Sequence, residues 1–233
     1  MSFKTLDDII NSDDLNLKNK SARIPIIFLI EATPEIKPNS LKNAIENFLF
    51  EINSNISMKS CADILILQFN SKTTKIREFS LVKQGETLSI KTETIKDELD
   101  WWNPLRFTLK EIQKRKKEYD TLNINFYQPT ILFLTSGNFD FSVNNESERI
   151  CEIVEGMKNS GSLSIIPFCE KKNNCELLRH ISVSGEVYST LTSDFTGVFD
   201  ELKKSLVSVS MSSTNAYKSL IDASQSWDDF VLR

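Results

Sequence analysis

Short, mainly apolar runs alternate along this chain with segments of helical periodicity. The apolar runs cover four ranges: Ile24–Ile30, Ala62–Phe69, Thr130–Leu134 and Leu163–Phe168. Runs of this length are typical of strands in a parallel sheet that is covered on both faces. Between them, apolar residues recur at helical spacing, as at Leu41, Ile45, Phe48 and Ile52. This alternation predicts an α/β fold, with a doubly wound, mainly parallel sheet flanked by helices.

The remaining segments extend this pattern. Thr74–Leu81 and Thr87–Thr94 flank Gln84-Gly85 and predict an edge hairpin, or one strand with a long return. A helix is expected to begin with Asn103 as its N-cap and Pro104 at the first helical position. Its run Lys114–Lys117 indicates a solvated face, with a contact for an acidic partner as the alternative.

Composition and charge exclude several classes of protein. The 233 residues carry a net charge of −4, which gives no electrostatic reason to expect nucleic acid. No apolar run approaches the roughly 20 residues of a membrane span, and residues 1–20 lack the apolar stretch of a signal peptide. Four cysteines without zinc-site spacing are expected to be buried free thiols. We therefore expect a cytoplasmic protein.

The sequence offers little for catalysis. The six glycines are scattered and form no phosphate-binding loop, and His180 is the only histidine. No serine or cysteine therefore has an evident base. We expect that the chain is not an enzyme.

Polar residues gather where the predicted strands end. Glu31, Thr33 and Glu35 follow the first strand at i, i+2 and i+4, and Ser136 follows the strand that ends at Leu134. Ligands of open α/β sheets bind outside the carboxyl ends of the strands. These side chains, with the loop that holds Asn103, are thus the candidate site.

This arrangement resembles the metal-ion-dependent adhesion site of von Willebrand factor A (VWA) domains, which carries Asp-x-Ser-x-Ser in its first loop. Here the first loop is Glu-x-Thr-x-Glu, while Asn103 replaces a threonine and Ser136 an aspartate. Arg23-Ile24-Pro25-Ile26 and Tyr127-Gln128-Pro129 are similar to segments of bacterial cytoplasmic VWA proteins of the tellurium-resistance type. The resemblance covers roughly residues 22–212 and implies a VWA/Rossmann-like fold.

The altered residues affect whether this site can bind a metal ion. Mg²⁺ requires near-ideal octahedral oxygen geometry, which long glutamates suit less well than aspartate and serine. We therefore expect no cofactor at a degenerate site formed by Glu31, Thr33, Glu35, Asn103 and Ser136. The alternative is a ligand-binding module in which Glu31 and Glu35 hold Mg²⁺ or Ca²⁺.

The resemblance implies a function in protein–protein interaction, as an adaptor in a bacterial stress-response or defence system. Its partners would be other proteins, including a kinase and a phosphatase of the same system. The expected partner-binding residues lie on rim loops and in the tail: Trp101, Trp102, Asn138, Phe139, Asp140, Phe141 and Trp227. Among them Trp102 is expected to be exposed, because acidic residues precede it. A third hypothesis is an α/β protein of another family that is similar to VWA domains only in topology.

Three segments make up the expected organisation: an N-terminal arm (1–21), a VWA-like domain (22–212) and a C-terminal tail (213–233). The arm reads as a docking helix, a partner peptide or a frayed terminus. The tail, with Trp227, either packs on the domain or binds a partner.

Overall fold

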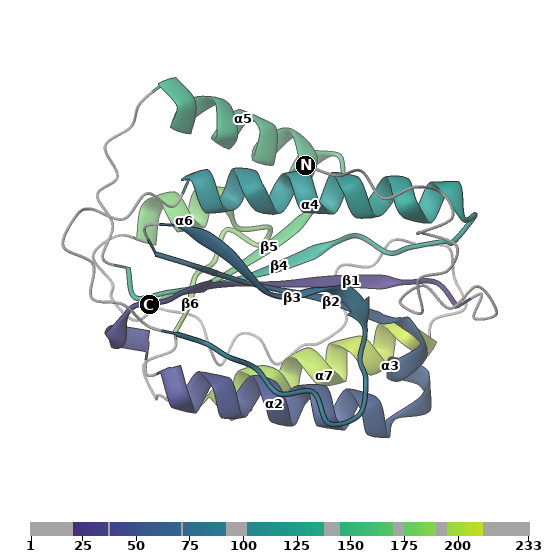
Figure 1. Cartoon of the computed structure of the whole chain (residues 1–233). Helices are drawn as coiled ribbons and strands as arrows, with labels where there is room; N and C mark the ends of the chain where they lie inside the picture. The colour runs from purple at the N-terminus through teal and green to yellow at the C-terminus, as the bar shows by residue number, and fades with distance from the viewer. Residues whose placement is uncertain are drawn as a thin grey trace.

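The computed structural model describes residues 21–36, 38–70, 72–91, 102–137, 145–169, 175–189 and 195–211. These residues form one six-stranded sheet with helices on both faces (Figure 1). The strands are β1 (Ile24–Glu31), β2 (Ala62–Phe69), β3 (Thr73–Leu81), β4 (Thr130–Thr135), β5 (Ser164–Cys169) and β6 (Tyr188–Ser189). The helices are η1 (Pro34–Ile36), α2 (Pro38–Ser54), α3 (Ile56–Cys61), α4 (Trp102–Thr121), α5 (Asn145–Asn159), α6 (Cys175–Ile181) and α7 (Phe195–Met211).

The strand order is β3-β2-β1-β4-β5-β6. All neighbouring strands are parallel except β2 and β3, which are antiparallel. β1 and β2 are buried along their whole length, as their apolar sequences predict. The predicted fold class, a doubly wound and mainly parallel sheet, is confirmed.

Each face of the sheet has its own apolar core. Alternate residues of β1 point to opposite faces, so Ile26, Phe28 and Ile30 pack on the side of α2 and α7. There the rings of Phe28, Phe48 and Phe199 lie 5.4–5.8 Å apart. The other core, under α4, α5 and α6, takes Ile27 and Leu29 of β1. The sheet is therefore held rigidly between two helical layers.

Two local features of the structure differ from what the sequence predicted. Residues 87–91 form no strand, although the alternation of Thr87–Thr94 predicted one; residues 92–94 lie outside the described part. The amide of Leu88 instead donates to the Glu46 carboxylate of α2 (2.7 Å). The short helix α3, with Asn55 as its N-cap, was not predicted.

The domain boundaries remain predictions, because residues 1–20 and 212–233 lie outside the described part. Among the described residues, no helix is long and apolar enough to cross a membrane.

Candidate functional site

The candidate site lies where the direction of the strand connections reverses. From β1 the chain passes to β2 on one side, whereas from β4 it passes to β5 on the other. The carboxyl ends of β1 and β4 are therefore neighbours at the switch point of the sheet, with Ile30 of β1 opposite Leu134 of β4. Ligands of open α/β sheets bind at this position.

Glu31, the last residue of β1, lies at the centre of this site and is only 1% exposed. Its Oε1 accepts hydrogen bonds from the hydroxyls of Thr33 and Ser136, both at 2.6 Å. Its Oε2 accepts from the hydroxyl of Thr135 (2.6 Å) and from the backbone amide of Ser136 (2.8 Å). We call these four residues the Glu31 clasp.

The clasp joins two loops that are more than a hundred residues apart in sequence. Hydrogen bonds to a carboxylate are short and about twice as strong as bonds between neutral groups. The Thr135 hydroxyl also accepts from the amide of Gly137 (3.0 Å). Gly137 has a φ of 81°, a left-handed conformation that glycine adopts without strain. The loop after β4 is thereby turned so that its hydroxyls and an amide face Glu31.

Of the predicted site residues, the structure brings Glu31, Thr33 and Ser136 together. Thr135 was missed as a site residue, although its place at the end of a strand beside Ser136 was a usable signal. Asn103 is exposed in the first turn of α4, where its side-chain oxygen accepts from Arg106. It lies inside the helix and is not the N-cap that the sequence predicted.

The other candidates lie partly or wholly outside the description. Glu35 belongs to η1, but its side chain is outside the described part. Outside the described residues altogether are the remaining predicted partner-binding positions: Trp101, Asn138, Phe139, Asp140, Phe141 and Trp227.

The expectation that Trp102 is exposed is wrong: it is buried, with 8% of its surface accessible. α4 begins at Trp102, so this residue stands on the same side of the helix as Leu105, Leu109 and Ile112. That side packs on the sheet in the second core. The acidic residues before Trp102 indicated solvent, but the helical register decides the direction of the side chain.

Replacing Trp102 with alanine should therefore lower the free energy of unfolding by about 3 kcal/mol, because a buried aromatic ring leaves a cavity. Urea unfolding followed by circular dichroism measures this. Asn103→Ala, one residue on and exposed, is the matched control and should change stability by less than about 0.5 kcal/mol. Equal stability of the Trp102 variant and wild type would contradict the packing.

In this arrangement the oxygens of the Glu31 carboxylate are occupied by donors from the protein. A carboxylate has about four lone-pair positions for hydrogen bonds, and the four donors of the clasp occupy them. Among the described residues, no group of three or more acidic, histidine or cysteine side chains could hold a metal ion. A cation at Glu31 would have to displace at least one of the four hydrogen bonds.

A second buried polar cluster lies at the other end of the strands. Asp63, the second residue of β2, is fully buried and accepts from Arg115 Nε (2.8 Å) and from the Tyr119 hydroxyl. Burial raises the pKa of Tyr119, and the nearby Asp63 raises it further. Burial alone would lower the pKa of Arg115, but Asp63 and Tyr119 hold it above its ordinary value.

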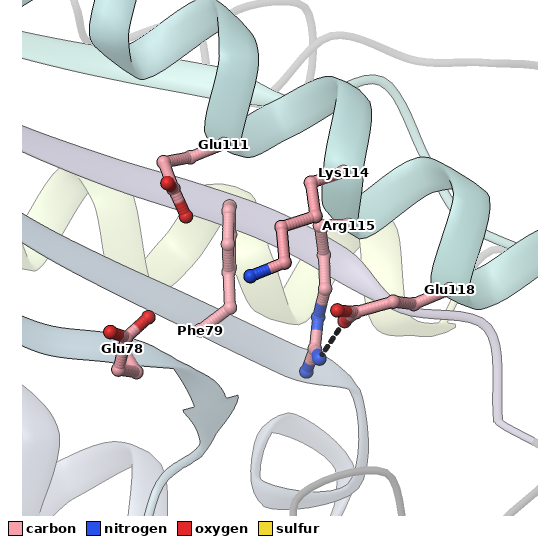
Figure 2. Close-up of a pocket in the computed structure, with 6 residues that line it drawn as sticks. All are labelled: Glu78, Phe79, Glu111, Lys114, Arg115 and Glu118. Atoms are coloured by element: carbon pink, nitrogen blue, oxygen red, sulfur yellow. Dashed lines mark hydrogen bonds and ion pairs between the residues drawn. The ribbon is translucent and has the colours of Figure 1, made fainter. Parts of the chain in front are cut away.

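A small hollow between β3 and α4 opens onto this cluster. Figure 2 shows its lining: Glu78, Phe79, Glu111, Lys114, Arg115 and Glu118. Arg115 donates to Glu118 (2.8 Å), and its guanidinium lies 5.6 Å from the ring centre of Phe79. Since Arg115 is also paired with Asp63, these contacts tie α4 to the sheet.

Comparisons with known proteins give matches in structure only. No family model and no curated protein matches the sequence. The pilus adhesin SpaC from Lactobacillus rhamnosus GG matches with a TM-score of 0.55 and 11% identity, over 82% of this chain and 31% of that one. Proximal thread matrix protein 1 from the mussel byssus matches with a TM-score of 0.53 and 12% identity, over 81% and 49%. The ArnB paralog VWA2 from Sulfolobus acidocaldarius matches with a TM-score of 0.47 and 16% identity, over 80% and 46%.

At these identities the likeness is one of fold. The mainly parallel six-stranded sheet flanked by helices is what this chain has in common with these proteins. The chain has a VWA-like fold. This VWA-like chain spans less than half the length of each of the three proteins.

Proposed function

We propose that this chain is a protein–protein interaction adaptor with a VWA-like fold and a degenerate metal site. The observation that carries the proposal is the Glu31 clasp, in which the carboxylate accepts four hydrogen bonds at the switch point of the sheet. With its acceptor positions filled by protein donors, Glu31 joins the two loops that a cation would otherwise join. Partner binding would then need no metal.

The partner surface we propose is the rim at the carboxyl ends of the strands. Aromatic residues on such loops often dominate binding energy when they are exposed. Trp101, Phe139 and Phe141 are the candidates there, together with Trp227 of the tail. Trp102 is no longer among them, because it is buried.

The proposed setting is a bacterial stress-response or defence system in the cytoplasm, with a kinase and a phosphatase among the partners. Its support is the resemblance of Arg23-Ile24-Pro25-Ile26 and Tyr127-Gln128-Pro129 to tellurium-resistance VWA proteins. We further propose that the chain acts by binding and not by catalysis. Its single histidine, His180, is about half exposed, with Glu155 as its ion-pair neighbour at 3.8 Å.

A thermal-shift titration tests the proposal. Mg²⁺, Mn²⁺ or Ca²⁺ should leave the melting temperature within error of the EDTA sample. A cation at 100 times its dissociation constant would instead stabilise the fold by about 2.7 kcal/mol. That corresponds to a rise of a few degrees in a domain of this size.

The matched variants are Glu31→Gln and Glu35→Gln. A stabilisation by cation in wild type that disappears in both variants would support the alternative, a metal-dependent ligand-binding module. A stabilisation that persists in both variants would mean that the cation binds elsewhere, and it would be consistent with a degenerate site at Glu31.

A further inference from the structure

The two helical layers of the fold differ in the charge of their outer surfaces. In one layer, exposed charged side chains follow the helices: Arg106, Lys110, Lys114 and Lys117 of α4, and Glu152 and Glu155 of α5. On the opposite side of the sheet (Figure 1), the exposed residues of α2 that the structure describes are Asn39, Asn43, Asn47, Phe50, Glu51 and Ser54. Glu51 is the one charged residue in this set. The outer surface of α2 is therefore unlike that of α4 and α5.

The uncharged residues of this set form a stripe along α2. Asn39, Asn43, Asn47, Phe50 and Ser54 are spaced by four, four, three and four residues, which keeps them on one side of the helix. We call these residues the α2 outer face. Phe50 is 68% exposed. Within the described part of the chain, the side-chain amides of the three asparagines make no hydrogen bond. The face thus combines amides that can still bond with an exposed aromatic ring.

The carboxylates on either side of this face are held by the rest of the fold. Glu46 accepts a hydrogen bond from the amide of Leu88 (2.7 Å) and lies 3.8 Å from the amine of Lys42. Glu51 pairs with Lys203 of α7 at 2.6 Å. The α2 outer face therefore presents uncharged groups between two satisfied carboxylates.

Asparagine is an unusual residue for these positions. It is a poor helix former, and glutamate or lysine suits an exposed helical position better. Sequences depart from such local preferences mainly at functional sites. An aromatic side chain within an uncharged surface is also the composition of the centre of a protein interface.

A second copy of the chain fits this face. Each asparagine amide donates through its nitrogen and accepts through its oxygen, so a row of amides is complementary to another such row. A two-fold axis across α2 brings the same surface of two copies together and runs the two helices antiparallel. With the axis near Asn47, the two Asn47 amides meet, and each Phe50 lies against the segment from Asn43 to Asn47 of the other copy. Asparagines at such helix contacts fix the register of the helices.

We propose that two copies of the chain associate through antiparallel α2 helices, with Asn47 near the two-fold axis and Phe50 packed across it. The contact lies on a helical layer, so it leaves the carboxyl ends of the strands open in both copies. An adaptor of this form would present two partner surfaces, which strengthens binding to a partner with two sites. This inference goes beyond the proposed function and does not depend on the Glu31 clasp.

The size of the contact sets the expected affinity. α2 has 17 residues and is about 25 Å long. A contact along one helix of this length is small for a specific interface, so we expect a dissociation constant on the order of 10 μM.

Sedimentation velocity of the full chain from about 1 to 100 μM tests the proposal. Wild type should pass from monomer to dimer over this range. Asn47→Glu should weaken the dimer at least about tenfold, because like charges then meet at the axis. Glutamate is a better helix former than asparagine, so this loss would not come from unfolding of α2. Phe50→Glu should weaken the dimer to a similar extent.

Matched controls make the same exchanges on the other helical layer. Gln113→Glu on α4 and Ile153→Glu on α5 alter exposed residues and should dimerise like wild type. A short bismaleimide should cross-link two copies of Asn47→Cys, whereas Gln113→Cys should stay at the wild-type background. A wild-type chain that stays monomeric over the whole range would overturn the proposal and leave the α2 outer face to a different partner. It would equally be overturned by a dimer that Asn47→Glu and Phe50→Glu weaken no more than the two controls do.

Discussion

Glu31→Ala should lower the free energy of unfolding by about 4 kcal/mol, because it leaves four buried donors without their acceptor. Three of these donors are hydroxyls, and the fourth is the backbone amide of Ser136. Each unsatisfied buried donor costs about 1–3 kcal/mol, and part of this is recovered where hydroxyls rotate to new partners. Urea unfolding at neutral pH measures the loss.

Two controls separate the hydrogen bonds from the volume of the side chain. Glu31→Gln keeps the shape and one acceptor oxygen, so it should lose about half as much stability. Thr33→Val removes one of the four donors and leaves the Glu31 carboxylate in place, and should cost about 1 kcal/mol. If the Glu31→Ala variant unfolds at the same urea concentration as wild type, the clasp contributes little to the free energy of unfolding.

The same substitution separates a scaffold from a metal site. In a working cation site, removal of a carboxylate ligand mainly reduces stabilisation by the cation. In the clasp, the loss of stability should be equal in EDTA and in Mg²⁺. Measuring Glu31→Ala under both conditions therefore tests the proposed function without knowledge of the partner.

The strands could be predicted from sequence because their signal is local. The sequences of β1 and β2 are mainly apolar, and both strands are buried along their whole length. The structure places the ends of both strands within one residue of the predicted ends. The meeting of Glu31 with Ser136 could also be predicted, since carboxyl ends of neighbouring parallel strands share one edge. What the sequence did not show was that Glu31 bonds directly to the residues of both loops, because that depends on how close the two loops lie.

Two features were not predicted: the burial of Trp102 and the pairing of Asp63 with Arg115. Trp102 was assigned to an acidic loop before the helix, whereas it is the first residue of α4 and lies on the same side as Leu105 and Leu109. The pairing of Asp63 with Arg115 spans 52 residues and has no local signal. An aspartate inside an otherwise apolar strand was the available hint, because a buried charge needs a partner.

That buried pair leads to the second large effect. Asp63→Ala should lower the free energy of unfolding by about 4 kcal/mol, because it leaves the guanidinium of Arg115 buried with Glu118 as its one remaining acid partner among the described residues. The Tyr119 hydroxyl loses its acceptor in the same variant. The desolvation of an unpaired charge, more than the lost attraction, accounts for most of this cost.

The double variant Asp63→Leu/Arg115→Met removes both charges and fills the space with apolar groups. It should be more stable than Asp63→Ala by about 2 kcal/mol, since replacing a buried pair costs much less than breaking it. Lys75→Met is a control on the neighbouring pair of Lys75 with Glu111, which is partly exposed, and it should cost about 1 kcal/mol or less. If the double variant is as unstable as Asp63→Ala, the instability comes from packing around β2 and not from the unpaired Arg115.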